Sequence, residues 1–498
     1  MSEPTDAGAG FALPPEGERR PTARRNPARG MLLLTITSGV FIVSGYAITV
    51  WLAHELGPTD FGRYSVVVAI TTLVNIVVAR GVPVAATRAI AADPEAAERT
   101  MDAAWRATIP LSIGTAALAA AAAVPLAAVL GDDALAVPLL VGAGAALTYG
   151  LQALLLAWFT GMHRYGRQAF AQSWYAVSRV VTIIGGGFVA GLTGAVAGFV
   201  VAPVIGALAT LRRVGRRRTE SSSRRASSRS APTARTLLQT SAPLVGVAAL
   251  VAALLSIDLL AFKRVGTATD VGRYAAAAAI AHVPFFLLRS APLVVMPAVA
   301  AALSAASKSP EGKLPAPVRV AIRRGVGDAV VLLALPTALI VALGDEALEL
   351  VFGTSYAVDG LLVAPLALAT AAVTLYSVLV AVETALGTLR VALATGAVGL
   401  AFVATAAAIG GQGSNPSRAA WGVAVAATLT FLAHAAFVWA RAGSFVPPRA
   451  VAATALAVAV GAVTLAAPPG AAWVATSALA ACVAYGAVAL RTGLMRLR

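Results

Sequence analysis

Long apolar segments, separated by short polar connections, fill almost the whole chain. A transmembrane helix needs about 20 mainly apolar residues, and most of these segments reach that length. The first is too long for the core of a signal peptide, and no A-x-A cleavage site follows it, so we expect it to remain as a span. The pattern predicts an all-α integral membrane protein with about 14 transmembrane helices. They are expected near residues 31–53, 64–87, 107–130, 136–160, 170–190, 194–211, 237–262, 274–304, 325–344, 360–386, 390–410, 418–440, 450–467 and 471–490.

Basic residues lie mostly in every second connection between these segments. The run from Arg212 to Arg235 and the group from Lys308 to Arg324 alternate with connections that carry acids, such as Asp132 and Glu349. Cytoplasmic loops are enriched in Lys and Arg, so the alternation predicts an even number of spans with both termini in the cytoplasm. The scarcity of lysine beside abundant alanine and arginine indicates a GC-rich bacterial genome. We therefore expect a multi-pass protein of the bacterial inner (plasma) membrane.

The composition supports lipid as the main solvent and excludes several classes of protein. Hydrophobic residues make up 59% of the chain and charged residues 12%, and the mean hydropathy is +0.82. A soluble protein of this length could not cover its surface with so few charges. The net charge of +16 lies in the connections without a nucleic-acid-binding module, so no nucleic-acid partner is expected. Cys482 is the single cysteine, which excludes disulfides and cysteine-based zinc sites; no cofactor and no metal site is expected.

One short motif occurs twice, about half the chain apart. Gly62-Arg63-Tyr64 with Arg80-x-x-Pro83 returns as Gly272-Arg273-Tyr274 with Arg289-x-x-Pro292, at offsets of 210 (62 to 272) and 209 residues (80 to 289). A duplicated membrane bundle is typical of transporters whose two halves face each other across a substrate path. The predicted organisation is a disordered basic tail (1–30), a six-helix lobe (31–211), a basic Ser/Arg-rich cytoplasmic linker (212–236), a second, pseudo-symmetric six-helix lobe (237–441), and two additional helices with a tail (442–498).

Arginines inside spans are the leading candidates for substrate binding. A charge in the membrane interior is costly and usually faces the bundle interior or a water-filled path. Arg80 and Arg289 hold matching places in the second and eighth spans, and the following prolines would kink each helix. We interpret both as lining a substrate path, with buried structural pairing as the alternative. Arg179 in the fifth span and His282, which shares a helical face with Arg289, complete the candidate set; a packed core histidine is the alternative for His282.

Two acidic residues inside spans are candidates for ion coupling. Asp258 lies near the outer end of the seventh span, where it could instead pair with Lys263 or Arg264 or cap the helix. Glu383 lies near the cytoplasmic end of the tenth span, where it could instead pair with Arg390. A carboxylate that binds and releases a proton or a sodium ion is a common element of transporters.

Three segments carry a resemblance to a known family. Residues Leu56 to Tyr64 (LGPTDFGRY) resemble the LGPxxFGxY signature of bacterial polysaccharide (oligosaccharide) flippases. Ser256 to Leu260, followed by Val271 to Tyr274, resembles the opening of their second half, and Leu350 to Ala357 resembles an outer-loop signature. The resemblance spans about 300 residues and points to the multidrug/oligosaccharidyl-lipid/polysaccharide exporter superfamily. It implies two six-helix lobes in a V shape, with helices one, two, seven and eight lining the cavity.

The resemblance also implies a function. Such flippases move polyprenyl-pyrophosphate-linked oligosaccharides from the inner to the outer leaflet for cell-surface polysaccharide biosynthesis, and cavity arginines would hold the pyrophosphate. A basic cluster on the first helix is not evident, which makes the peptidoglycan precursor a less expected substrate. The expected partners are the lipid-linked oligosaccharide, membrane lipids, and a glycan polymerase or glycosyltransferases.

Two alternatives stay open. An ion-coupled multidrug antiporter of the same superfamily would use Asp258 or Glu383 as its titrating group. A membrane glycosyltransferase or polymerase would need a large outer loop with catalytic residues, and the outer connections here are short. We therefore expect a transporter and not an enzyme. The chain has no G-x-x-x-x-G-K-[ST] run for ATP hydrolysis, so an ion gradient, the membrane potential or consumption of the product would have to supply the energy.

Overall fold

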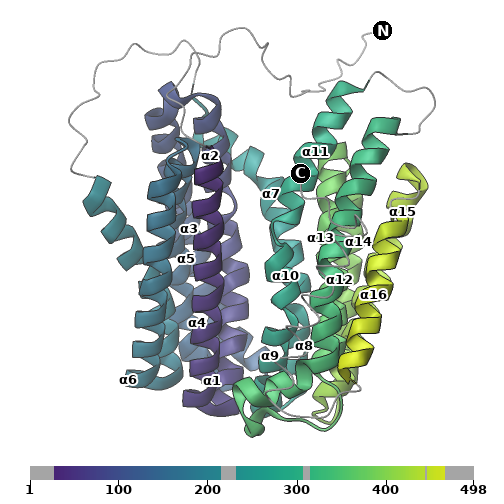
Figure 1. Ribbon diagram of the computed structural model, residues 1–498. Helices are drawn as coiled ribbons and strands as arrows, with labels where there is room; N and C mark the ends of the chain where they lie inside the picture. Colours follow the sequence, from purple (N-terminus) through teal and green to yellow (C-terminus); the bar gives the residue numbers. More distant parts are fainter. Residues whose placement is uncertain (1–26, 215–230, 307–313, 444–445, 466–498) are drawn as a thin grey trace, which may run out of the picture.

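The chain folds into two helical bundles that lie side by side (Figure 1). The computed structural model describes residues 27–214, 231–306, 314–443 and 446–465, and in these residues every regular element is a helix. We call the end of the molecule at which α1 begins the terminal side, and the opposite end the closed side. The two bundles touch at the closed side and diverge toward the terminal side (Figure 1).

The first bundle crosses six times, because two of its helices double back. Its helices are α1 (Pro27–Ala79), α2 (Val82–Ala92), α3 (Ala97–Val129), α4 (Ala136–Ala143), α5 (Ala145–Gly161) and α6 (Tyr165–Val214). In α1 the break lies at Gly57, whose φ of 66° favours glycine, and Pro58 then opens the second limb. In α6 the break lies at Ala190 and Gly191. The contacts across that break pair Gly186 with Gly194 and Thr182 with Gly198, as the limbs of an antiparallel hairpin must.

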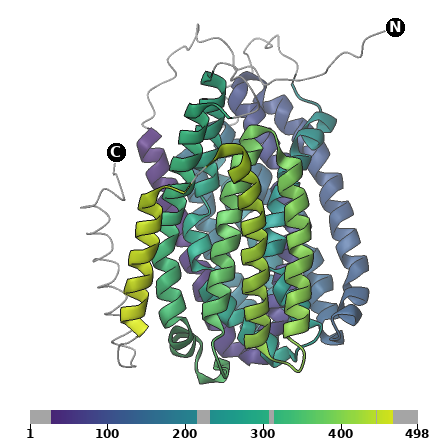
Figure 2. The same cartoon turned by 90° about the vertical axis from the view of Figure 1, so that its right-hand side faces the viewer.

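The second bundle also crosses six times, and two of its crossings are broken helices. Its helices are α7 (Ala234–Leu254) with α8 (Ile257–Lys263), α9 (Ala268–Ala281) with α10 (Val283–Leu288) and α11 (Ala291–Ala305), and then α12 (Ala316–Phe352), α13 (Val363–Leu386), α14 (Leu389–Gly410) and α15 (Pro416–Ala442). A thirteenth crossing, α16 (Pro448–Leu465), packs on α12 at the outer edge of the bundle (Figure 2). The fourteenth predicted span, 471–490, lies outside the described residues, so the count of fourteen is not confirmed.

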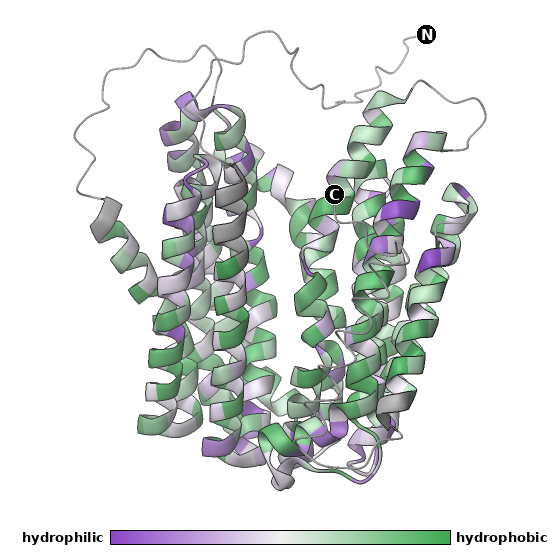
Figure 3. Ribbon diagram, in the orientation of Figure 1, coloured by the Kyte–Doolittle hydropathy of each residue, from purple (hydrophilic) through white to green (hydrophobic). Residues whose placement is uncertain are grey.

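The exterior of the bundles is apolar, as a lipid-facing surface requires. Large hydrophobic side chains are widely exposed, including Val189 (82%), Phe188 (76%) and Leu118 (73%). Apolar residues run along the length of the helices, and polar residues collect toward their ends (Figure 3). Ten described helical segments are long and apolar enough to cross a membrane, and two of them are the continuous stretches that contain the hairpins of α1 and α6. The protein is therefore a multi-pass membrane protein.

One hydrophobic cluster contains residues of both bundles. Each of the other clusters lies within one bundle, and two of them also include residues of α7. The cluster that both bundles share includes Phe61 of α1, Tyr274 of α9 and Phe352 of α12, all at the closed side. The other link is α7, whose first half contacts α2 and α3 and whose second half contacts α13 and α14. In Figure 1 this helix lies between the bundles. The core thus holds the bundles together at one end and along one connecting helix.

Candidate substrate-binding site

The two copies of Arg-x-x-Pro form the same local structure. Arg80 lies at the break between α1 and α2, and Arg289 lies at the break between α10 and α11. In each copy the proline occupies the first turn of the next helix, where its missing N–H costs no helical hydrogen bond. The motif therefore ends one helix at the arginine and starts another immediately after it. The N-terminus of a helix, with the positive end of its dipole, therefore lies next to an arginine in both bundles.

The two arginines come from different bundles and approach each other. Both side chains are exposed, yet the positive charge of Arg80 acts on the guanidinium of Arg289. The two guanidinium groups are therefore close enough for their charges to interact. Among the ion pairs of the described residues, none involves Arg80 or Arg289. The break at Arg80 is also close to α7, because a Cβ on Gly81 would lie 3.1 Å from the Val245 side chain.

Arg179 lies elsewhere in the first bundle, on the first limb of α6. Its guanidinium carbon sits 4.5 Å from the centre of the Phe41 ring of α1 and 5.9 Å from that of Tyr175. Such distances are typical of cation–π contacts. The Tyr175 hydroxyl in turn donates to the hydroxyl of Tyr149 at 2.6 Å. Arg179 is half-buried in this aromatic group, apart from Arg80 and Arg289 in the sequence and in its ring contacts.

His282 lies at the junction of α9 and α10, beside α1. The hydroxyl of Tyr46 donates to the Ala279 carbonyl at 2.8 Å, and the Tyr46 ring meets Phe286 edge-on at 6.3 Å. His282 falls between these two contacts in the sequence and is half-buried. His282 and Arg289 flank the two ends of α10, both with αR backbone, and the shared face expected for them stays a prediction.

The two acidic candidates lie inside the second bundle and not between the bundles. Asp258 is buried in the first turn of α8, and its Oδ2 accepts a hydrogen bond of 2.8 Å from the Tyr274 hydroxyl. The alternative pairing of Asp258 with Lys263 is wrong, because Lys263 binds Asp132 of the other bundle at 2.9 Å. Asp258 forms no ion pair with Arg264 either in the described residues.

Glu383 has a partner that the sequence did not suggest. It is buried in α13, and its Oε2 lies 3.5 Å from Nε2 of His434 on α15. The alternative pairing with Arg390 is wrong, because Arg390 is exposed and forms no ion pair with Glu383. A histidine within an otherwise apolar span was the available signal for His434.

The closed side is built by the duplicated glycines and by an ion-pair group. A Cβ on Gly62 would lie 2.7 Å from the backbone nitrogen of Gly272, so the two motifs pack backbone to backbone. Asp132 binds Arg63 of its own bundle at 3.0 Å and Lys263 of the other. Burial raises the pKa of the Asp132 carboxyl, but the hydrogen bonds from Arg63 and Lys263 outweigh it and leave that pKa below its usual value.

Further contacts between the bundles complete the closed side. The hydroxyls of Thr59 and Thr269 lie 2.8 Å apart, and the Tyr356 hydroxyl donates to the Ala53 carbonyl at 2.6 Å. The Phe61 ring of α1 packs against the rings of Phe352 and Tyr356. Sequence analysis singled out the glycine motif but did not assign it this role.

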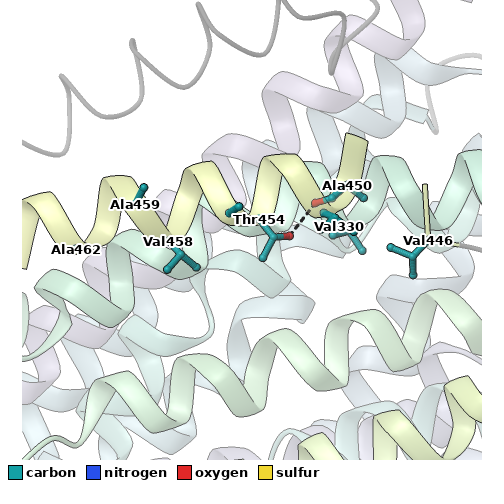
Figure 4. Close-up of a pocket in the computed structure, with 9 residues that line it drawn as sticks. Val330, Val446, Ala450, Thr454, Val458, Ala459 and Ala462 are labelled. Carbon is teal, nitrogen blue, oxygen red and sulfur yellow. Dashed lines mark hydrogen bonds between the residues drawn. The ribbon is translucent and has the colours of Figure 1, made fainter. Parts of the chain in front are cut away.

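An apolar groove lies away from the arginines, between α12 and α16 (Figure 4). It has a volume of about 620 Å³ and is lined by Val330, Ala450, Val458 and similar side chains. The hydroxyl of Thr454 in this groove already donates to the Ala450 carbonyl at 2.9 Å. The groove offers no charged group to a polar substrate, so the space beside Arg80 and Arg289 is the better candidate site.

Solved structures of membrane transporters share this fold. A structure of the lipid II flippase MurJ in an inward closed conformation superposes with a TM-score of 0.69 at 11% identity, over 93% of this chain and 100% of that one. An inward-facing multidrug resistance MATE family transporter gives 0.63 at 14% identity (86% and 99%). An outward-facing structure with the same family description gives 0.53 at 16% identity (84% and 97%).

The sequence identifies the family more narrowly. A family model described as polysaccharide biosynthesis protein matches residues 28–302, which is more than half of the chain. The chain therefore belongs to that family. A search of curated proteins found no match.

Proposed function

We propose that this transporter is a flippase that moves a polyprenyl-pyrophosphate-linked oligosaccharide from the inner to the outer leaflet for cell-surface polysaccharide biosynthesis. The observation that supports the proposal is the pair Arg80 and Arg289, one exposed arginine from each bundle, close enough for their charges to interact. Guanidinium groups bind phosphate oxygens through two parallel N–H donors. Two neighbouring cations without a paired carboxylate are best neutralised by a ligand with at least two negative charges, as a pyrophosphate diester has.

The surroundings of the arginines suit the other parts of this substrate. The positive ends of the α2 and α11 helix dipoles lie beside the arginines and favour an anionic group there. Tyr46, Phe286 and His282 lie on the closed-side flank of Arg289, where aromatic and polar side chains can contact sugar rings. The polyprenyl tail would remain in lipid, beside the apolar exterior of the helices.

Alternating access follows from the way the bundles are joined. Contacts among α1, α9 and α12 close one side, while the arginines remain accessible toward the other. Binding of one pyrophosphate by both arginines would draw the bundles together at the terminal side, because it replaces mutual repulsion with a shared attraction. Opening of the closed side would then release the sugar there.

The orientation in the membrane follows from the distribution of charge. The connections at the terminal side are the ones rich in arginine, so the positive-inside rule places this side, with both termini, in the cytoplasm of a bacterial cell. The space between the bundles would then be open to the cytoplasmic leaflet, where the sugars of a lipid-linked oligosaccharide lie before transfer. Partners such as a glycan polymerase or glycosyltransferases would act before and after this step.

The alternative functions have less support. An exporter of organic cations should place acids between the bundles, but Asp258 and Glu383 are buried within the second bundle. An enzyme acting on glycans would need a facing pair of catalytic groups on the closed side and not only single exposed acids such as Glu349. Asp345, in that region, already accepts the backbone N–H groups of Leu362 and Val363 at 3.0 and 2.9 Å. That carboxylate caps the N-terminus of α13, and its Oδ1 is occupied by these two hydrogen bonds.

The decisive experiment locates lipid-linked oligosaccharide in the two leaflets of cells depleted of this protein. We expect it to accumulate on the cytoplasmic leaflet, and we expect wild type, but not Arg80→Ala/Arg289→Ala, to restore its transfer. Arg418→Ala is the matched control, since it removes an exposed arginine at the start of α15. Rescue by the double variant would keep the flippase and reject the site. An unchanged distribution on depletion would reject the flippase itself.

A further inference from the structure

A carboxyl group and an imidazole face each other in the interior of the second bundle. Glu383 of α13 and His434 of α15 have exposed fractions of 1% and 0%, and 3.5 Å separates Oε2 of the former from Nε2 of the latter. The two Glu383 oxygens and His434 Nε2 have no hydrogen-bond partner in the described structure. A buried ionised carboxylate without a partner is strongly unfavourable, so the protons on this pair determine how stable the local packing is.

The other ring nitrogen of His434 has a partner that favours one tautomer. Nδ1 lies 2.9 Å from Oγ1 of Thr395 on α14. When the Thr395 hydroxyl donates its one hydrogen to the Val391 carbonyl at 2.9 Å or the Ala392 carbonyl at 3.2 Å, its oxygen accepts from Nδ1–H. In that tautomer Nε2 of the neutral ring carries a lone pair and no proton.

One proton is needed between the two facing groups. Without it, the Nε2 lone pair would oppose a carboxylate oxygen in a dry environment. With it, either the protonated Glu383 donates to Nε2 or an imidazolium donates to the carboxylate, and both arrangements contain the same number of protons. We propose that Glu383 and His434 form a binding site for a single proton within the second bundle, and that its occupancy controls the movement of this bundle.

The titratable groups around the site are few. The nearest is Tyr376 of α13, whose ring centre lies 4.9 Å from that of His434 and whose hydroxyl donates to the Ala392 carbonyl. Arg441 of α15 and the Ala392 backbone N–H also act on Glu383. The segments α10 and α11 contain no ionisable side chain.

The other charged groups on the surrounding helices point away from the site. The first half of α12 presents Val318 and Ile322 to the core, and its charged side chains are exposed: Arg319, Arg323, Arg324 and Asp328. Arg390 of α14 and Arg235 of α7 are exposed, and Asp270 and Arg273 of α9 pair with each other at the closed side.

A continuous hydrophobic cluster connects this site with the helix break at Arg289. The cluster contains Leu288, which precedes Arg289, Val382, which precedes Glu383, and Ala435, which follows His434. Val295 and Val299 of α11 belong to the same cluster. A change in the spacing of α13 and α15 on loss of the proton must therefore be accommodated by the packing behind Arg289. Coupling of the proton to transport rests on the proposed function, whereas the proton site itself does not.

Infrared difference spectroscopy on the purified full-length protein in lipid nanodiscs tests the site without substrate. In a pH titration we expect a band from the C=O stretch of a buried protonated carboxyl group. Glu383→Gln should abolish this band, and His434→Gln should shift the midpoint of its titration. The control Glu349→Gln, which alters an exposed acid of α12, should leave it unchanged. The assignment would be overturned if the band persists in Glu383→Gln, or if the midpoint of its titration is unchanged in His434→Gln.

A transport assay in proteoliposomes with an imposed pH gradient tests the coupling. Wild type should respond to the gradient, and Glu383→Gln should transport at a rate that no longer depends on it. Full gradient dependence in Glu383→Gln would reject the coupling and leave the flippase intact. Absence of transport by wild type, with the infrared band present, would reject the proposed function and leave the proton site intact.

Discussion

Gly62 and Gly272, the corresponding glycines of the two copies of the duplicated motif, pack against each other across the interface between the bundles. A Cβ on Gly62 would overlap the Ala268 carbonyl oxygen, and one on Gly272 would overlap the carbonyl of Pro58. Neither position has room for a side chain, so glycine is needed at both positions for the two backbones to pack directly against each other. The duplicated segments that identify the two halves are also the segments that close one side of the molecule.

Substitution at these glycines should open the closed side. Gly272→Ala should reduce the contact between Thr59 and Thr269, whose hydroxyls are 2.8 Å apart, because α1 and α9 must separate. Thr59→Cys/Thr269→Cys in a Cys482→Ser background measures this directly as the yield of disulfide on mild oxidation. The control is Gly114→Ala on α3, where no atom lies within 4 Å of the added methyl group. An equal yield in Gly272→Ala and the control would contradict the packing argument.

Within the ion-pair group at Asp132, substitution of the aspartate should destabilise the closed side more than substitution of Lys263. Asp132→Asn removes the partner of Lys263, which is only 4% exposed, whereas Lys263→Met leaves Asp132 paired with Arg63. Removing one member of a buried pair typically costs roughly 3–5 kcal/mol. We expect Asp132→Asn to lower the closed-side disulfide yield and the melting temperature more than Lys263→Met does. A larger loss in Lys263→Met than in Asp132→Asn would show that an unpaired Lys263 charge is not the main cost of breaking the group.

The same carboxylate predicts a dependence on pH. Because Arg63 and Lys263 hold the pKa of Asp132 below its unfolded value, the closed state binds fewer protons than the separated state. The stabilisation is therefore complete above the unfolded pKa of about 3.9 and is lost as pH falls toward the lower, folded value. The melting temperature should fall at acid pH by more in wild type than in Asp132→Asn, which has no carboxylate to protonate there. An equal fall in the two proteins below pH ~4 would contradict this assignment.

The sequence predicted the crossings well because lipid imposes a simple pattern on them. Arg80 and Arg289 could also be selected as candidates, because each recurs in the other half with a proline three residues later, and this repetition is visible in the sequence. The pairing of Glu383 with His434 could not, because it depends on how α13 and α15 are rotated against each other. Lys263 and Asp132 are 131 residues apart in different bundles, and their contact exists only when the closed side is formed. Local patterns predicted helices and breaks, whereas contacts between distant helices required the fold.

Arg80 and Arg289 should respond to a pyrophosphate ligand as a unit. In the free protein they repel each other, so either single alanine substitution should leave the melting temperature unchanged or raise it. Farnesyl pyrophosphate, a short soluble probe, should raise the melting temperature of wild type by mass action and should lose most of this effect in Arg80→Ala and in Arg289→Ala. Because a Lys side chain keeps the charge but lacks the planar fork, Arg80→Lys should recover only part of the stabilisation. Arg418→Ala controls for net charge, and farnesyl monophosphate controls for the second phosphate. Equal stabilisation of wild type and both alanine variants would place the anion elsewhere in the molecule.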